Sequence, residues 1–149
     1  MTTHDDTATL NEMIEVLHDG QSFYDEAAQH VHSDLGSVFS RMARTKANIA
    51  TDLSAKVAAR GDTPAEGGSF AGSIRKFYAE LRTALASDKA AAYVVQLEEF
   101  EDRILAAFRK AVEESNDEGV REIAQRYMPE VTRDHNDMRA LKKIQQARA

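Results

Sequence analysis

Apolar residues recur every three or four positions along most of the chain, the spacing that places them on one face of an α-helix. Four long stretches show this pattern, separated by short polar or breaker segments. Their expected bounds are about 9–32, 35–60, 88–114 and 118–147. Residues 1–8 carry no such pattern. We therefore expect a disordered tail over 1–8 and a single helical domain over 9–147.

The strongest break in the pattern is the segment 61–69, where three glycines and a proline stand among polar residues. A shorter amphipathic helix, predicted over about 73–86, follows it, and its apolar face consists of Ile74, Phe77, Tyr78, Leu81 and Leu85. In contrast, only residues 115–117 separate the last two long helices, which makes them antiparallel neighbours. The pattern predicts an all-α four-helix bundle of the ferritin-like kind, with a long crossover carrying the short extra helix between its second and third long helices.

Composition narrows the classes of protein that this bundle could belong to. The 149 residues include no cysteine, which excludes disulfides, thiolate metal sites and cysteine nucleophiles, so any metal would need carboxylates and imidazoles. A net charge of −6 without a basic block argues against nucleic acid or an anionic membrane as a partner. No apolar run approaches the roughly 20 residues of a membrane span, and no signal peptide pattern is present, so we expect a cytoplasmic protein.

Polar residues interrupt the inner face of every long helix near its middle. On the third long helix, Glu101 falls within roughly 10° of the centre of the apolar stripe, where a leucine would be ordinary. An unpaired carboxylate buried there would cost several kcal/mol. The interruptions fall at comparable heights if the helices pack in register. They are Gln21, Lys46, Glu98, Glu101, Asp134 and His135. We expect the last five to meet in one buried polar cluster.

Two interpretations of this cluster remain open. In the first, Glu98, Glu101 and His135 bind iron, manganese or zinc, and the metal activates water or oxygen. In the second, Lys46 pairs with Glu101, and His135 or Asp134 bonds to Glu98, so that the network only fixes helix register. The second is favoured, because a lysine supplies positive charge where a dication would otherwise stand. We therefore expect no catalytic residue and no cofactor.

The remaining features give weaker hypotheses. His18, His30 and His32 crowd the first helix, but their spacing does not bring them together on one side, which disfavours a metal site there. The apolar stripe of the predicted helix 73–86 could instead be exposed and bind a partner protein. Bundle faces of this kind also favour self-association, and we expect a homo-oligomer, with a dimer favoured.

The chain resembles a family of uncharacterised bacterial ferritin-like four-helix-bundle proteins, a domain of unknown function found mostly in proteobacteria. The resemblance runs from about Leu10 to Leu141. It rests on scattered positions, which are Leu10-Asn11, Asp19-Gly20, Phe23, Ala27-Ala28, Gly61, Pro64, Gly68-Ser69, Gly72, Glu98, Glu101, Asp102 and His135. The chain resembles a divergent member of this family. It has Arg75, Lys76 and Tyr78 where the family tends to have a His-Arg pair and a Trp, and Glu99-Phe100 in place of Arg-Gly.

The resemblance implies the fold more than any chemistry. Ferritin-like proteins with two metal ions take a glutamate from each of two helices and a Glu-x-x-His pair from each of the other two. Here the corresponding positions are Thr132-x-x-His135 on the last helix, Lys46-x-x-Ile49 on the second and Gln21 on the first. Several ligands are therefore missing. The sequence predicts a ferritin-like bundle with a polar remnant at its centre.

Overall fold

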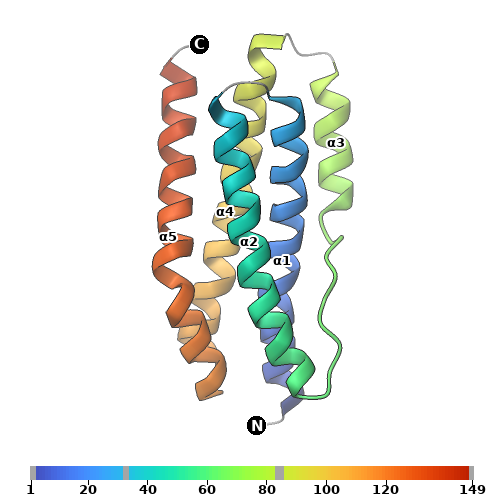
Figure 1. Cartoon of the computed structure of the whole chain (residues 1–149), viewed down its shortest axis with the longest axis vertical. Coiled ribbons are helices and arrows are strands. Elements are labelled where there is room, and N and C mark those ends of the chain that lie inside the picture. The colour runs from blue at the N-terminus through green and yellow to red at the C-terminus, as the bar shows by residue number, and fades with distance from the viewer. Residues whose placement is uncertain (1–2, 32–33, 83–85, 148–149) are drawn as a thin grey trace.

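The structure, a computed structural model, describes residues 3–31, 34–82 and 86–147, which form five α-helices and no β-strand (Figure 1). These are α1 (Thr3–His30), α2 (Asp34–Ala59), α3 (Ala71–Leu81), α4 (Ala86–Glu114) and α5 (Glu118–Ala147). The all-α bundle predicted from the sequence is confirmed for the residues described. None of the helices in these ranges has a stretch both long enough and apolar enough to cross a bilayer.

A crossover returns the chain along the full length of the bundle between α2 and α4. Figure 1 shows α1 and α5 running in one direction and α2 and α4 in the other. Because α2 and α4 run in the same direction, the chain must return to the starting end between them. The extended segment 61–70 and α3 make that return beside α1.

The crossover is fastened to α1 by polar side chains spaced one helical turn apart. Residues four apart lie on one side of a helix, so these side chains form a row facing the crossover. Asn11 uses both ends of its amide, donating to the Thr63 carbonyl oxygen at 3.2 Å and accepting from the Ala65 N–H at 2.8 Å. The Ser69 hydroxyl donates to the Glu15 carboxylate. The row on α1 consists of Thr7, Asn11, Glu15 and Asp19.

The last member of this row explains two glycines of the crossover. The Gly68 N–H donates to Asp19 Oδ1 at 2.6 Å. Gly67 and Gly68 both have positive φ, 91° and 109°, a conformation that other residues rarely adopt. A Cβ on Gly67 would also come within 2.9 Å of the Asp19 carboxylate. Glycine at 67 and 68 therefore lets the backbone turn closely over α1.

The start of α1 differs from the expectation. The disordered tail predicted over residues 1–8 is wrong for residues 3–8, which belong to α1, and Thr9 lies inside the helix rather than at its cap. The reason is a long-range contact. Thr7 is buried, and its hydroxyl donates to the Asp62 carboxylate at 3.0 Å. The returning crossover thus gives this polar segment a partner that the local sequence does not reveal.

The core is divided into two apolar clusters, one toward each end of the bundle. One contains Leu17, Ile49 and Ile104 among its members, and the other contains Phe23, Phe39 and Phe100. Along α2, α4 and α5 alike, the boundary between the two clusters falls at a buried charged residue. These residues are Lys46, Glu101 and Asp134. A polar layer therefore crosses the middle of the bundle.

The short helix α3 is covered by the protein's own aromatic side chains. Phe77 is buried, and its ring lies 5.2 Å from each of the rings of Phe23 on α1 and Tyr93 on α4. Ile74, Tyr78 and Leu81 are partly buried against the same cluster. The exposed stripe considered for this helix is therefore wrong at these positions, and Leu85 lies outside the described residues.

Candidate functional site

Lys46, Glu101 and Asp134 meet at the centre of the bundle. The Lys46 ammonium lies 2.8 Å from Glu101 Oε2 and 2.7 Å from Asp134 Oδ2. The Lys46 side chain is only 1% exposed and that of Glu101 is 0% exposed. At this depth neither charge has water to solvate it, so the ion pairs must do so.

Tyr24 completes this cluster from α1. Its hydroxyl donates to Glu101 Oε2 at 2.5 Å, and its ring lies 5.5 Å from the Lys46 ammonium. The other oxygen of Glu101 is buried and has no hydrogen-bond partner among the described residues. We call Tyr24, Lys46, Glu101 and Asp134 the central cluster. All four long helices contribute one side chain to it.

Two opposing effects act on the pKa of Glu101 in the central cluster. Burial raises the pKa of the Glu101 carboxyl, whereas the Lys46 ammonium and the Tyr24 hydroxyl lower it, and burial outweighs them. Burial also raises the pKa of the Tyr24 hydroxyl, and the Glu101 charge raises it further. The cluster therefore contains one strongly held cation, two acids and a phenol that stays protonated.

A two-metal site does not fit this centre. The Lys46 ammonium stands between the only two carboxylates of the central cluster, and a protonated lysine offers no electron pair to a metal. A metal ion placed there would have to displace an ammonium that is buried between both acids. The residues present are suited to an internal ion-pair network.

A second group of ligand-type side chains lies at the edge of α4 and α5. Glu98, Asp102 and His135 each place one ligand atom within 4.8 Å of the others. His135 Nε2 lies 2.5 Å from Asp102 Oδ1, and the Lys142 ammonium lies 3.6 Å from Glu98 Oε2. We call Glu98, Asp102 and His135 the seam cluster.

The structure thus divides the one cluster expected from the sequence into two. Lys46, Glu101 and Asp134 come together at the centre, whereas Glu98 and His135 lie in the seam cluster. The ligand set Glu98, Glu101 and His135 is not assembled, because Glu101 points inward to Lys46. The bond expected between Glu98 and His135 or Asp134 is replaced by His135 with Asp102 and Asp134 with Lys46.

Two side chains of these clusters were not predicted from the sequence. Asp102 follows Glu98 by four residues, a spacing that puts both on one side of a helix, and this signal was available. The pattern along the first helix indicates Gln21, and not Tyr24, as its polar contribution. Gln21 is half-buried and Tyr24 reaches the centre, because a phenol is long enough to bring its hydroxyl to the neighbouring helices.

Among the residues that the structure describes, the other histidines form no comparable group. His30 is exposed, with its Nδ1 2.8 Å from the Glu26 carbonyl oxygen and 3.9 Å from the Glu26 carboxylate. His32 lies outside the described residues. Within the described ranges, the seam cluster is the one group of three carboxylates or imidazoles with metal-ligand spacing.

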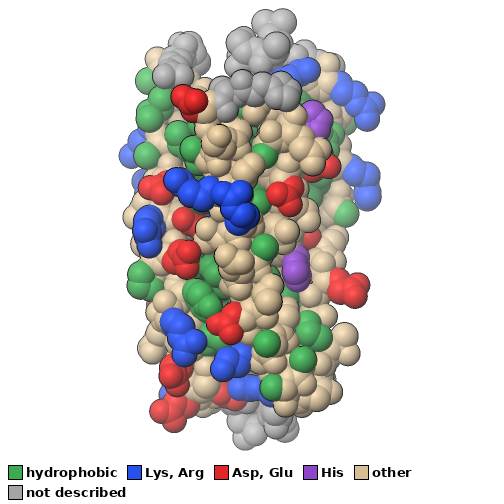
Figure 2. Space-filling model, viewed as in Figure 1, with side chains coloured by type: hydrophobic (Ala, Val, Ile, Leu, Met, Phe, Trp, Pro, Cys, Tyr) green, Lys and Arg blue, Asp and Glu red, His purple; other side chains and the backbone are tan. Residues whose placement is uncertain are grey.

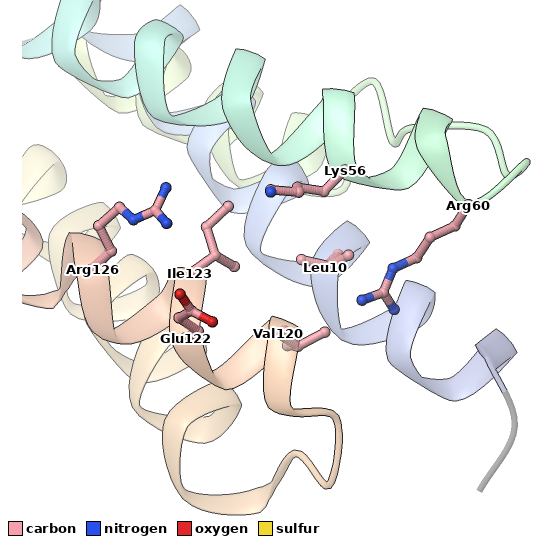
Figure 3. A pocket seen from close by; sticks show the side chains of 8 residues that line it. Leu10, Lys56, Arg60, Val120, Glu122, Ile123 and Arg126 are labelled. Atoms are coloured by element: carbon pink, nitrogen blue, oxygen red, sulfur yellow. The ribbon is translucent and has the colours of Figure 1, made fainter.

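A separate hollow of about 180 Å³ lies where α1, α2 and α5 meet (Figure 3). It has an apolar side formed by Leu10, Val120 and Ile123. Its charged rim is formed by Lys56, Arg60, Arg126 and the acidic Glu122. Arg60 is already bound to both oxygens of Asp117, at 3.1 and 3.3 Å. Because this pair ties the end of α2 to the start of α5, we interpret the hollow as a gap between helix ends.

The tyrosines predict how stability changes in alkali. The pKa of each is raised, for Tyr127 to about 12 because its hydroxyl donates to Asp52, and for Tyr24, Tyr78 and Tyr93 chiefly by burial. The unfolded chain ionises its tyrosines near pH 10, while the folded chain keeps them protonated. Stability from these groups is therefore fully present below pH 10 and is lost as pH rises through the folded values.

We expect the urea midpoint of unfolding to fall steadily between about pH 10 and pH 12. Phenolate absorption should appear together with the loss of helical circular dichroism. The variant Tyr127→Phe should show a shallower fall, because one of the groups that ionise on unfolding is gone. Phenolate absorption that develops fully while the helical signal is unchanged would contradict the prediction.

Most of the chain matches a known protein family. A family model described as a domain of unknown function (DUF2383) matches residues 5–114, about three quarters of the chain. The matched region ends with the last residue of α4, so Asp134 and His135 lie beyond it. A comparison with curated proteins found no match.

Proposed function

The chain belongs to the DUF2383 family, a domain of unknown function, and we propose that it is a non-catalytic bundle of ferritin-like architecture whose centre is closed by an ion-pair network. The crossover between α2 and α4 supports the ferritin-like part of this proposal, because one long crossover distinguishes that architecture from a simple up-and-down bundle. The role would be structural or interaction-based, with no reaction at the centre.

The observation that carries the proposal is the position of the Lys46 ammonium. It lies within 2.8 Å of both buried acids, in the region where two-metal ferritin-like proteins gather glutamate and histidine ligands from four helices. The contributions here are a phenol from α1 and an ammonium from α2. Lys46 supplies the positive charge that metal ions supply in those proteins.

The buried ion pairs also fix how the four long helices are aligned along one another. The central cluster separates two apolar clusters. A shift of one helix along another would move Glu101 or Asp134 against apolar side chains and away from Lys46, at the cost of burying an unpaired charge. The proposed benefit of the cluster is therefore a single register of the four helices, as buried polar residues specify register in coiled coils.

Self-association and a cytoplasmic location remain expectations from the sequence. Figure 2 shows acidic and basic side chains interspersed over one face of the bundle. Among the side chains that the structure describes, Val95 on α4 and Ile144 on α5 are the exposed large apolar ones. A second copy or another partner bound to this part of the chain would therefore meet a largely polar surface.

Metal analysis tests the proposal. Protein purified without chelator from cells supplied with iron and manganese is expected to carry far less than one equivalent of either metal, and it should not accelerate the oxidation of Fe²⁺ in air. Stoichiometric iron or manganese that is lost in Glu101→Gln but kept in Glu99→Gln would overturn the proposal. Glu99 is a suitable control because it is exposed on the same helix.

A further inference from the structure

The seam between α4 and α5 carries two adjacent pairs of polar residues. The inner members, Glu101 and Asp134, point into the bundle and bind Lys46. Their outer neighbours, Asp102 and His135, contact each other at the edge. Glu98 lies one turn before Asp102 on the same side of α4. Glu101 and Asp134 therefore bind the Lys46 ammonium, whereas Asp102 and His135 face away from it.

We propose that Glu98, Asp102 and His135 form a binding site for a divalent transition-metal ion, with Zn²⁺ as the ion to test. Zinc accepts imidazole nitrogen and carboxylate oxygen ligands, and many zinc sites use three protein ligands with water in the fourth position. Ligand atoms around tetrahedral zinc lie roughly 3.3 Å apart. The seam cluster already holds one atom of each side chain within 4.8 Å of the others, so these atoms need to approach one another by no more than about 1.5 Å to reach that spacing.

Differences in exposure show which ligands are fixed and which can adjust. The side chains of Glu98 and His135 are 11% and 13% exposed, whereas that of Asp102 is 54% exposed. Two ligands are therefore held by the surrounding protein, and the third is free to rotate onto the ion. The cluster borders an open pocket of about 380 Å³, which gives a metal ion and its water access from solvent.

Lysine competes with metal much less here than at the centre. The Lys142 ammonium is 3.6 Å from Glu98, and its side chain is 31% exposed. Lys46, in contrast, is buried within 2.8 Å of two acids. Because Lys142 can turn into water at little cost, a dication can replace it and be neutralised by the carboxylates of Glu98 and Asp102. Arg139 and Lys143 also border the pocket, so the surrounding charge weakens the site.

Titration calorimetry with Zn²⁺ alone on chelator-treated full-length protein tests the proposal. The wild type is expected to bind about one Zn²⁺ per chain. His135→Ala and Asp102→Asn should each weaken binding by at least about tenfold, the loss that changes around metal ligands commonly produce. His30→Ala is the matched control, because His30 is an exposed histidine beside a glutamate and belongs to no group of three ligands among the described residues. This variant should bind Zn²⁺ as the wild type does.

Removal of Lys142 should strengthen Zn²⁺ binding, whereas removal of a ligand should weaken it. Lys142→Gln should bind Zn²⁺ several-fold more tightly than the wild type, because the cation that Zn²⁺ displaces is gone. Binding of Co²⁺ should also produce a visible absorption band that is lost in His135→Ala. Circular dichroism will show that each variant is folded.

Three results would overturn the proposed zinc site. The wild type could release no heat of binding at millimolar Zn²⁺. Alternatively, folded His135→Ala could bind Zn²⁺ as tightly as the wild type, or Lys142→Gln could bind it more weakly. Any of these would leave the seam cluster as a hydrogen-bonded surface network. The outcome is independent of the proposed function, because metal at the centre depends on Glu101 and metal at the seam depends on His135.

Discussion

Replacing Lys46 with methionine is expected to lower the free energy of unfolding by about 3–5 kcal/mol, because the change leaves buried carboxylates without their cation. Among the described side chains, Glu101 would keep only the Tyr24 hydroxyl as a partner, and Asp134 would lose its hydrogen bond to the ammonium. Urea unfolding near neutral pH, followed by circular dichroism, measures the loss.

Two further variants separate the buried network from the removal of a lysine in general. Lys110→Met breaks an exposed pair with Glu12, 3.2 Å apart, and should change stability by no more than about 0.5 kcal/mol. The triple variant Lys46→Met, Glu101→Leu and Asp134→Leu should recover most of the loss, because apolar residues can replace a whole buried ion-pair network. A triple variant less stable than Lys46→Met would show that unpaired charge is not the cause.

The decrease in the free energy of unfolding caused by Lys46→Met should also depend on pH. The folded pKa of Glu101 is already raised above its ordinary value, and removal of the ammonium raises it further. A raised carboxyl pKa gives stability that is fully present below the unfolded pKa and is lost as pH rises through the folded pKa. The difference between Lys46→Met and the wild type should therefore shrink as pH falls toward about 4, near the unfolded pKa of a glutamate. An equal difference at all pH values would contradict this account.

The second large effect is expected at Phe23. Its ring lies 5.2 Å from Phe77, 5.5 Å from Phe100 and 5.7 Å from Tyr93. These contacts join α1 to α3 and α4. Phe23→Ala removes a fully packed ring and should cost about 3–5 kcal/mol in the free energy of unfolding, measured by urea unfolding.

Hydrogen exchange distinguishes this contact from a general loss of core packing. α3 is held to the bundle by large side chains, so loss of Phe23 should make the amides of α3 exchange faster relative to those of α2. Phe39→Ala is the control, because Phe39 is equally buried but belongs to α2 and contacts Tyr24 at 6.1 Å. It should reduce stability by a similar amount without singling out α3. Equal effects of both variants on α3 would rule out Phe23 as its anchor.

Much of the bundle follows from local rules that the sequence states directly. Each residue advances about 100° around a helix, so the spacing of apolar residues identifies the helices and the side that each one buries. The same rotation indicated that Lys46 and Glu101 face inward, and both are buried in the structure. The break at 61–69 likewise marked where the chain leaves α2, and the structure has an extended segment there.

Errors arose where a residue depends on a partner far away in the chain. Residues 3–8 look like a tail because their pattern is polar, yet Thr7 finds Asp62 through the returning crossover. The stripe on α3 looked available to a partner because nothing local shows that Phe23 and Tyr93 cover it. In both cases the stabilising contact joins residues more than fifty positions apart or on different helices. Helical periodicity describes positions within one helix, so it could not predict these contacts.

The sequence by itself determined the helices, their buried sides and the presence of charge in the core. Only the tertiary structure decided how those charges pair. Neighbours such as Asp134 and His135 differ by about 100° of rotation, and the turn of α5 about its own axis against α2 and α4 sends Asp134 to Lys46 and His135 to Asp102. Helical periodicity fixes angles within one helix, whereas the rotation and height of a helix relative to its neighbours come from packing among all of them.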